Sequence, residues 1–182
     1  MKKALIVIDV QNDYFEGGKY PLHKPQEALH QINRLEAYFK KIQQPIIYVQ
    51  HINLMKGASF FEVNTSGVEL HHDLNIGSKA IIIEKQYPNS FFKTNLLEIL
   101  KNHAIEALVI TGMMTHMCID STTRAAKEHG FNNLLIHDAT ATRDLVSADG
   151  KKVLATDVQT AYLWALMNFS QILSTNEFLE NE

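Results

Sequence analysis

VITGMMTHMCIDSTTRAA, residues 109–126, joins an apolar run to a segment with helical character. The run from Ala107 to Thr111 is almost continuously apolar, which is typical of a parallel strand buried on both faces. The residues that follow predict a helix from Cys118 to His129, with Thr115 as a candidate cap and Gly130 at its end. A strand that leads into a helix is a building unit of parallel α/β sheets.

The same alternation of apolar runs and helical segments continues on both sides of this segment. Further short apolar runs predict strands at residues 4–8, 45–49, 80–83 and 133–136. Helices are expected at residues 26–41, 92–100 and 151–169. This alternation favours a parallel sheet covered by helices on both faces. The segment 53–78 has no clear period, and we expect it to be a long functional loop.

Length and composition set limits on the kind of protein. The chain has 182 residues, 46% of them hydrophobic, so we expect a single domain, residues 1–182, with a sizeable core. A net charge of -3 without a basic stripe argues against a nucleic-acid partner and favours a small molecule. The apolar stretch near the N-terminus is too short for a signal peptide or a membrane span. A single cysteine fits a reducing compartment, so we expect a cytoplasmic location and no membrane association.

Three chain segments each carry one reactive side chain. Asp9 follows the run 4–8, Lys85 follows the run 80–83, and Cys118 lies early in the predicted helix of the central segment. Right-handed crossovers place the carboxyl ends of parallel strands on one edge of a sheet, where ligands bind in such folds. We therefore expect a carboxylate, an ammonium group and the only thiol of the chain to converge there.

A cysteine near a helix start is a candidate nucleophile. The helix dipole and its unpaired N–H groups are expected to lower the pKa of the Cys118 thiol and to stabilise an oxyanion. Taken singly, Cys118 has an alternative as a small core residue, Asp9 as a turn residue and Lys85 as a solvated side chain. A redox sensor is a further alternative, although no second cysteine is present. Because no G-x-G-x-x-G follows the first strand, we expect no dinucleotide and no other cofactor.

Three motifs together resemble the isochorismatase-like hydrolase superfamily, which includes nicotinamidases and N-carbamoylsarcosine amidohydrolases. They are ALIVIDVQNDYF around Asp9, EKQYPNSFF around Lys85 and the central segment around Cys118, in the order usual for that superfamily. The resemblance spans nearly the whole chain. It implies a Rossmann-like, three-layer α/β/α fold with about six parallel strands, and a catalytic triad of Cys118, Asp9 and Lys85.

The resemblance also implies a mechanism. Asp9 takes the thiol proton of Cys118, Lys85 stabilises the charged pair, and the thiolate attacks a carbonyl carbon. The oxyanion accepts hydrogen bonds from the backbone N–H groups of Met114 and Cys118, and water then cleaves a thioester. A cis peptide bond is expected between Met113 and Met114. The implied activity is hydrolysis of a C–N bond in a small amide or ureido substrate.

Departures from two branches of the superfamily narrow the expected activity. Nicotinamidases carry Asp-x-His after the second strand to hold a divalent metal, whereas this chain has His51 and Asn53 there. We therefore expect no metal, with His51, His71 and His72 as a minor alternative set. Isochorismatases proper hydrolyse a vinyl ether without a catalytic cysteine, so Cys118 favours amide chemistry. A vinyl-ether hydrolase, or a member that binds a ligand without turnover, remains the alternative.

Weaker predictions concern the substrate pocket and the assembly. Candidate pocket residues follow the predicted strands, lie in the long loop or flank the thiol: Phe15, His51, Phe60, Phe61, Tyr87 and His116. Each has a core or bracing role as its alternative. Ser90 is a candidate for orienting the loop of Lys85. Relatives are commonly dimers or tetramers, so a homo-oligomer is expected.

Overall fold

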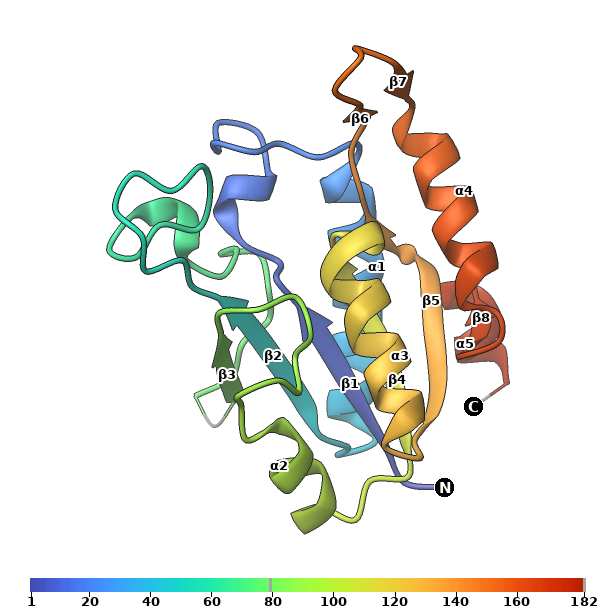
Figure 1. Cartoon of the computed structure of the whole chain (residues 1–182). Helices are drawn as coiled ribbons and strands as arrows, with labels where there is room; N and C mark the ends of the chain where they lie inside the picture. The colour runs from blue at the N-terminus through green and yellow to red at the C-terminus, as the bar shows by residue number, and fades with distance from the viewer. Residues whose placement is uncertain (79, 182) are drawn as a thin grey trace.

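The computed structural model describes residues 1–78 and 80–181, with a six-stranded sheet at its centre (Figure 1). The strands are β1 (Lys3–Ile8), β2 (Ile46–His51), β3 (Ile81–Lys85), β4 (Ala107–Met113), β5 (Asn132–Ala141) and β8 (Gln171–Leu173). Their order is β3-β2-β1-β4-β5-β8, and every pairing is parallel. The predicted sheet is confirmed. The predicted domain 1–182 also includes Lys79 and Glu182, which lie outside the described residues.

Helices cover both faces of the sheet (Figure 1). Apolar residues of α1 (Pro25–Lys41) and α5 (Thr175–Glu180) pack on one face, and those of α2 (Leu96–Asn102), α3 (Asp120–Glu128) and α4 (Ala155–Leu166) on the other. In β1, Leu5 and Val7 join the first cluster, while Ile6 and Ile8 join the second, because side chains alternate along a strand. The three-layer architecture is thus confirmed. None of the helices among the described residues has the length and hydropathy needed to cross a bilayer.

The last third of the chain differs from the sequence prediction. The prediction lacks β8 and α5, because both are too short to show a hydrophobic period. Ser174 and Glu177 form a capping box at the start of α5, which was the available signal. The predicted helix 151–169 is also too long. Its first residues pair in a small hairpin, β6 (Leu145–Val146) with β7 (Lys152–Val153), and α4 begins only at Ala155.

The chain changes its direction of travel across the sheet between β1 and β4, which are central neighbours. At such a switch point the connections after the two strands diverge, leaving a crevice where ligands bind in open α/β sheets. Gly112 lets the two strands meet there. It pairs with Ile8 at a φ of +117°, and a Cβ on this residue would lie 2.0 Å from the carbonyl oxygen of Ile8. Only glycine fits this position.

Gly112→Ala is therefore expected to destabilise the fold strongly. The contact with Ile8 and the positive φ both oppose a side chain, so we expect a loss of about 3 kcal/mol or more in the free energy of unfolding. Gly150 is a matched control, since its φ is +82° but an added Cβ would meet no atom within 4 Å. Gly150→Ala should cost about 1 kcal/mol. Urea denaturation measures both, and equal losses would contradict the role assigned to the strand contact.

Candidate active site

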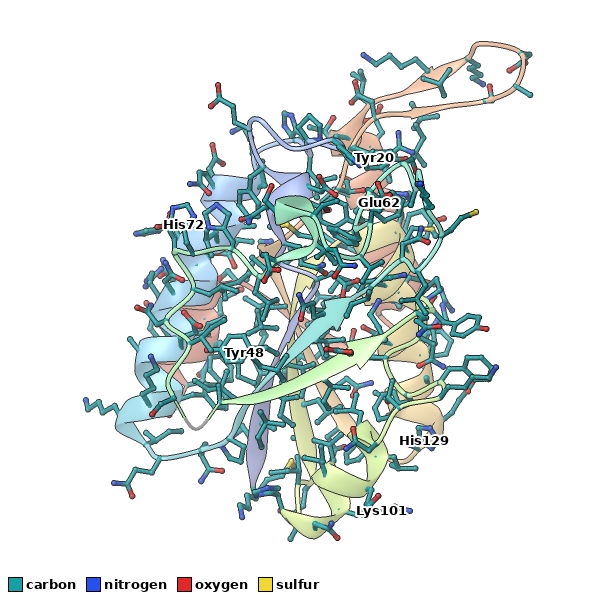
Figure 2. All side chains as sticks on the ribbon, turned by 90° about the vertical axis from the view of Figure 1, so that its left-hand side faces the viewer. Tyr20, Tyr48, Glu62, His72, Lys101 and His129 are labelled. Atoms are coloured by element: carbon teal, nitrogen blue, oxygen red, sulfur yellow. The ribbon has the colours of Figure 1, made fainter. Side chains whose placement is uncertain are left out.

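Asp9, Lys85 and Cys118 meet at the carboxyl edge of the sheet. The Lys85 ammonium donates to Asp9 Oδ2 at 2.7 Å and to Cys118 Sγ at 3.2 Å, and all three residues are buried. Lys85 ends β3, Asp9 follows β1, and Cys118 follows β4, so three separate strands deliver them. In Figure 2, Tyr20 and Glu62 mark this end of the molecule, while Lys101 lies at the opposite end. The convergence expected from the sequence is present.

The backbone at Asp9 fixes the carboxylate against the strand ends. Asp9 adopts a left-handed φ of 52°, which is uncommon outside glycine but tolerated by aspartate, and its N–H donates to Val49 at 2.9 Å. One carboxylate oxygen, Oδ2, accepts from Lys85. The other, Oδ1, is buried and has no hydrogen-bond partner in the described part of the chain. A buried carboxylate oxygen without a donor is suited to accept a proton.

The Lys85 ammonium remains protonated in this environment. Burial alone lowers the pKa of Lys85, but the charge of Asp9 and the sulfur of Cys118 raise it, and the net shift is upward. Buried Ser90 ties the loop of Lys85 to α3, because its Oγ lies 2.9 Å from Thr122 Oγ1 and its N–H donates to the same atom at 3.1 Å. The role predicted for Ser90 agrees with this contact.

Cys118 lies in a π-helical turn, Thr115–Ile119, that continues into α3. Thr115 does not cap this turn. Its Oγ1 lies 2.7 Å from Gln159 Oε1 and 3.2 Å from the carbonyl oxygen of Ala141, which fastens the turn to α4 and β5. The peptide bond between Met113 and Met114, at the entry to the turn, is cis.

The expected lowering of the thiol pKa is wrong for the resting protein. Burial raises the pKa of the Cys118 thiol, the nearby charge of Asp9 raises it further, and Lys85 opposes both only in part. A helix start favours a thiolate, but the cost of burying a thiolate beside a carboxylate is larger at this position. Cys118 is therefore a neutral thiol at rest, and its sulfur lies within 4.8 Å of a carboxylate oxygen of Asp9.

Gln11 is a site residue that the sequence reasoning missed. Its buried side chain accepts from the His51 N–H at 2.9 Å and donates to the His51 carbonyl oxygen at 2.9 Å. The same amide donates to the carbonyl oxygen of Val68 in the long loop at 2.7 Å. Gln11 thus fixes the end of β2 against the segment after β1. An amide two residues after Asp9 in DVQND was the available signal.

His51 lies inside the site. Its Nδ1 is 3.1 Å from the Lys85 ammonium and 3.9 Å from Asp9 Oδ2. Ligand-type atoms of Asp9, His51 and Cys118 lie within 4.8 Å of one another, a spacing that would suit a metal ion. The ammonium of Lys85 is within hydrogen-bonding distance of all three residues, so the chain itself supplies the positive charge at their centre.

The other candidate pocket residues separate into two groups. The rings of Phe60 and Phe61 lie 6.4 Å and 5.9 Å from that of His51, so the long loop brings them to the edge of the site. Phe15 instead packs on His71 at 4.0 Å within the core. Two further candidates have contacts away from the triad: Tyr87 packs on Phe92 at 4.8 Å, and His116 Nδ1 lies 2.6 Å from Thr142 Oγ1.

Tyr14 and Arg143 lie near the site, although neither was predicted from the sequence. Burial raises the pKa of Tyr14 strongly, and Cys118 and Asp9 raise it further, so Tyr14 lies close enough to both groups to interact with them electrostatically. The Arg143 guanidinium stacks over the ring of Tyr20 at 4.4 Å, and its charge also acts on Tyr14. The Nε of Arg143 is buried without a hydrogen-bond partner in the described residues. An incompletely paired guanidinium therefore lies beside an aromatic wall that consists of the rings of Tyr14, Tyr20 and Phe60.

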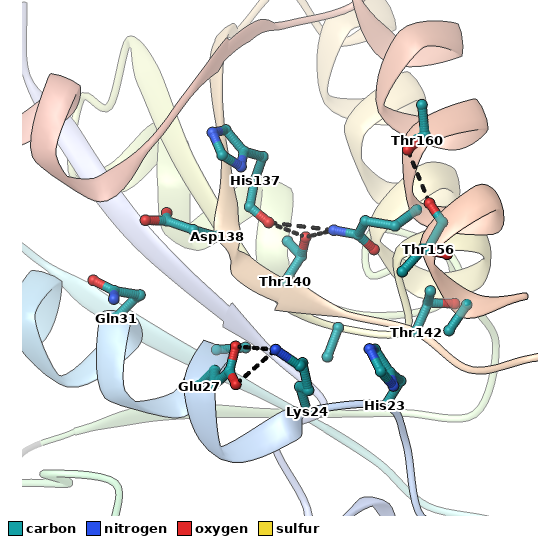
Figure 3. Close-up of a pocket in the computed structure, with 14 residues that line it drawn as sticks. His23, Lys24, Glu27, Gln31, His137, Asp138, Thr140, Thr142, Thr156 and Thr160 are labelled. Atoms are coloured by element: carbon teal, nitrogen blue, oxygen red, sulfur yellow. Dashed lines mark hydrogen bonds and ion pairs between the residues drawn. The ribbon is translucent and has the colours of Figure 1, made fainter.

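A separate cavity of about 480 Å³ lies between α1, β5 and α4 (Figure 3). Its polar side chains include His23, Glu27, Asp138 and Thr156, and none of the triad residues lines it. Thr142 connects the two regions, since it lines this cavity and also contacts His116. The cavity is therefore distinct from the place where the triad residues meet.

The raised thiol pKa predicts slow alkylation. Because the chain has one cysteine, iodoacetamide reports on Cys118 alone. At pH 7 the folded protein should react more slowly than the same protein in urea, where the thiol has an ordinary pKa of about 8.5. Asp9→Asn removes a charge that raises the pKa and should accelerate the reaction without changing the size of the side chain. A folded wild-type protein that reacts as fast as the unfolded chain would contradict the pKa direction.

The chain is similar to several known proteins. The isochorismatase domain family matches residues 3–177. The uncharacterized isochorismatase family protein YddQ of Bacillus subtilis (strain 168) is 41% identical over 181 residues, which cover 99% of this chain and 100% of that protein. A streptothricin hydrolase of Streptomyces noursei is 28% identical over 167 residues, 90% of this chain and 59% of its own.

The fold is also similar to that of a solved structure. The crystal structure of an isochorismatase from Pseudomonas putida KT2440 superposes with a TM-score of 0.89 at 32% identity, and the match covers 96% of this chain and 88% of that chain. The family therefore matches almost the entire sequence, and the whole fold resembles that of an isochorismatase. The chain belongs to the isochorismatase family of hydrolases.

Proposed function

We propose that the protein hydrolyses a C–N bond of a small amide or ureido substrate through a thioester on Cys118. The observation that carries this proposal is the contact of one buried ammonium, on Lys85, with both the thiol and the carboxylate of Asp9. A nucleophile, a base and a cation that stabilises the charged state are the parts that covalent amide hydrolysis requires. The presence of a thiol at this position favours C–N cleavage over vinyl-ether hydrolysis.

The first half of the reaction forms the thioester. Asp9 Oδ1, which has no donor in the described residues, takes the proton of Cys118 as the sulfur attacks the carbonyl carbon. The new C–S bond pushes the carbonyl electrons onto oxygen, and the backbone N–H groups of Met114 and Cys118 donate to that oxyanion. When the C–N bond breaks, Asp9 returns the proton to the nitrogen, and a neutral amine or ammonia leaves.

The second half of the reaction releases the acid. A water molecule attacks the thioester carbonyl, and Asp9 accepts one of its protons. The tetrahedral intermediate collapses, the C–S bond breaks, and the sulfur leaves as a thiolate that regains its proton from Asp9. Lys85 keeps its positive charge throughout, because its raised pKa prevents it from giving up a proton. Its task is to stabilise the two negative groups in turn.

The chemistry of the wall narrows the substrate. The exposed fraction of Cys118 is 4%, so only a small acyl group reaches the sulfur without rearrangement of the surrounding side chains. Arg143 offers a guanidinium whose Nε lacks a partner in the described residues, and such a group pairs well with a carboxylate. The aromatic rings of Tyr14 and Phe60 provide the apolar part of the wall. A small amide or ureido compound with an anionic group fits these features, and the relative named for streptothricin supports the hydrolase class.

The proposal is tested by ammonia release from a panel of small amides, ureido acids and nicotinamide, with isochorismate included for vinyl-ether cleavage. Cys118→Ala and Asp9→Asn should each reduce turnover by about 1000-fold or more, since each removes a group that acts in the chemical step. Lys85→Ala should have nearly the same effect. Lys101→Ala, at the opposite end of the molecule (Figure 2), is the matched lysine control and should retain full activity.

Circular dichroism confirms that each variant is folded before its activity is compared. Turnover that persists in folded Cys118→Ala would exclude the thioester mechanism. Turnover of isochorismate alone would favour the vinyl-ether alternative. Binding of panel compounds without turnover, measured by calorimetry on the wild-type protein, would favour a ligand-binding member.

A second prediction concerns Arg143. If its guanidinium binds a substrate carboxylate, Arg143→Gln should raise KM for anionic amides by about tenfold or more and leave KM for neutral amides unchanged. Arg143→Lys keeps the charge but not the forked geometry, so its KM should be intermediate. The measurement is the ratio of KM values for a carboxylate-bearing amide and its methyl ester. A ratio that does not change in Arg143→Gln would exclude the predicted contact.

A further inference from the structure

The ammonium of Lys85 has one more close neighbour than the triad requires. Its three protons face three acceptors: Asp9 Oδ2 at 2.7 Å, His51 Nδ1 at 3.1 Å and Cys118 Sγ at 3.2 Å. A buried ammonium group needs an acceptor for every N–H, because a donor without a partner in the interior is costly. The imidazole of His51 completes the set.

His51 accepts this proton only in one chemical state. An imidazolium has protons on both nitrogens and cannot accept from Lys85, so the ring must be neutral with its proton on Nε2. The groups that face the ring have opposing effects: burial lowers the pKa of His51 to about 4, with the nearby charge of Lys85 as the second cause, and Asp9 acts in the opposite direction. At neutral pH the ring is therefore in the state that the geometry requires.

The position of the ring does not depend on Lys85. Gln11 bonds to both the N–H and the carbonyl oxygen of His51, which fixes the backbone at the end of β2. The side chain then packs between Phe61 on one side and the triad on the other. Because His51 pairs with Lys85 in the register of β2 and β3, the two side chains start from neighbouring positions. The backbone of His51 is thus fixed independently of Lys85, and its imidazole can hold the Lys85 ammonium in place.

We infer that His51 is a positioning residue whose neutral Nδ1, as the third acceptor of the ammonium, holds Lys85 between Asp9 and Cys118. The inference rests on the proposed function for its catalytic consequence, but not for the contact itself. Without the imidazole the ammonium has two acceptors, and the shorter contact, to the carboxylate of Asp9, draws it away from the sulfur. The thiolate that forms during attack would then lose part of its stabilisation.

The contact is tested by nitrogen-15 NMR of the histidine rings in the full-length wild-type protein, which needs no substrate. The chain has nine histidines, and the signals absent from His51→Asn identify those of His51. We expect the Nε2–H tautomer at pH 7 and no titration between pH 8 and 5, a range that contains the ordinary histidine pKa of about 6.5. An Nδ1–H tautomer, or titration near that value, would overturn the inference whatever the enzyme hydrolyses.

The positioning role is tested with whichever compound the panel identifies as a substrate. Asn places an oxygen where Nδ1 lies, so His51→Asn should keep kcat within about threefold, whereas His51→Leu, which has no acceptor, should lower kcat by about 10- to 100-fold with KM almost unchanged. Loss of turnover through KM alone, or equal loss in both variants, would overturn it. If His51→Leu does not fold, the tautomer seen by NMR and the kcat of His51→Asn still test the inference. Failure of the proposed function would appear separately, as turnover in Cys118→Ala.

Discussion

A single buried ammonium organises this protein's candidate active site. Lys85 carries its charge out of water and is stabilised by a carboxylate at 2.7 Å, an imidazole nitrogen at 3.1 Å and a sulfur at 3.2 Å. Removing one partner of such a buried pair leaves a charge without compensation, which typically costs about 3–5 kcal/mol. The residues around Lys85 are therefore coupled. A change in one of them alters the position or the protonation of the others.

The sheet delivers these groups in spatial order. β3, β2, β1 and β4 are successive neighbours, and their carboxyl ends contribute Lys85, His51, Asp9 and Cys118 respectively. Adjacent strands lie about 4.8 Å apart, so side chains from four strands can converge only if they point inward along the same edge. Gly112 has no side chain that would obstruct the close approach of β1 and β4 in this row. A few residues at the strand ends therefore give this common fold a specific site.

The sequence was informative where one physical effect dominates. The buried strands β1 and β4 are apolar runs in the sequence, and the reactive residues that follow them could be predicted. Effects that depend on packing could not be predicted from the sequence. Whether the pKa of Cys118 rises or falls depends on the balance between burial, Asp9 and Lys85, which requires distances. Tyr14 and Phe15 are adjacent aromatic residues, and only the turn that contains them decides that Tyr14 packs on Phe60 and Phe61 while Phe15 packs on His71.

The protonated state of Cys118 has a consequence for the durability of the protein. Peroxides and electrophilic metabolites react with thiolates far faster than with thiols, and the products of repeated oxidation are irreversible. A resting sulfur that is buried and protonated escapes most of these encounters. Its reactivity appears only while a carbonyl carbon is bound beside it and Asp9 has taken the proton. The burial that makes the nucleophile harder to ionise thus also lengthens the working life of the chain's only cysteine.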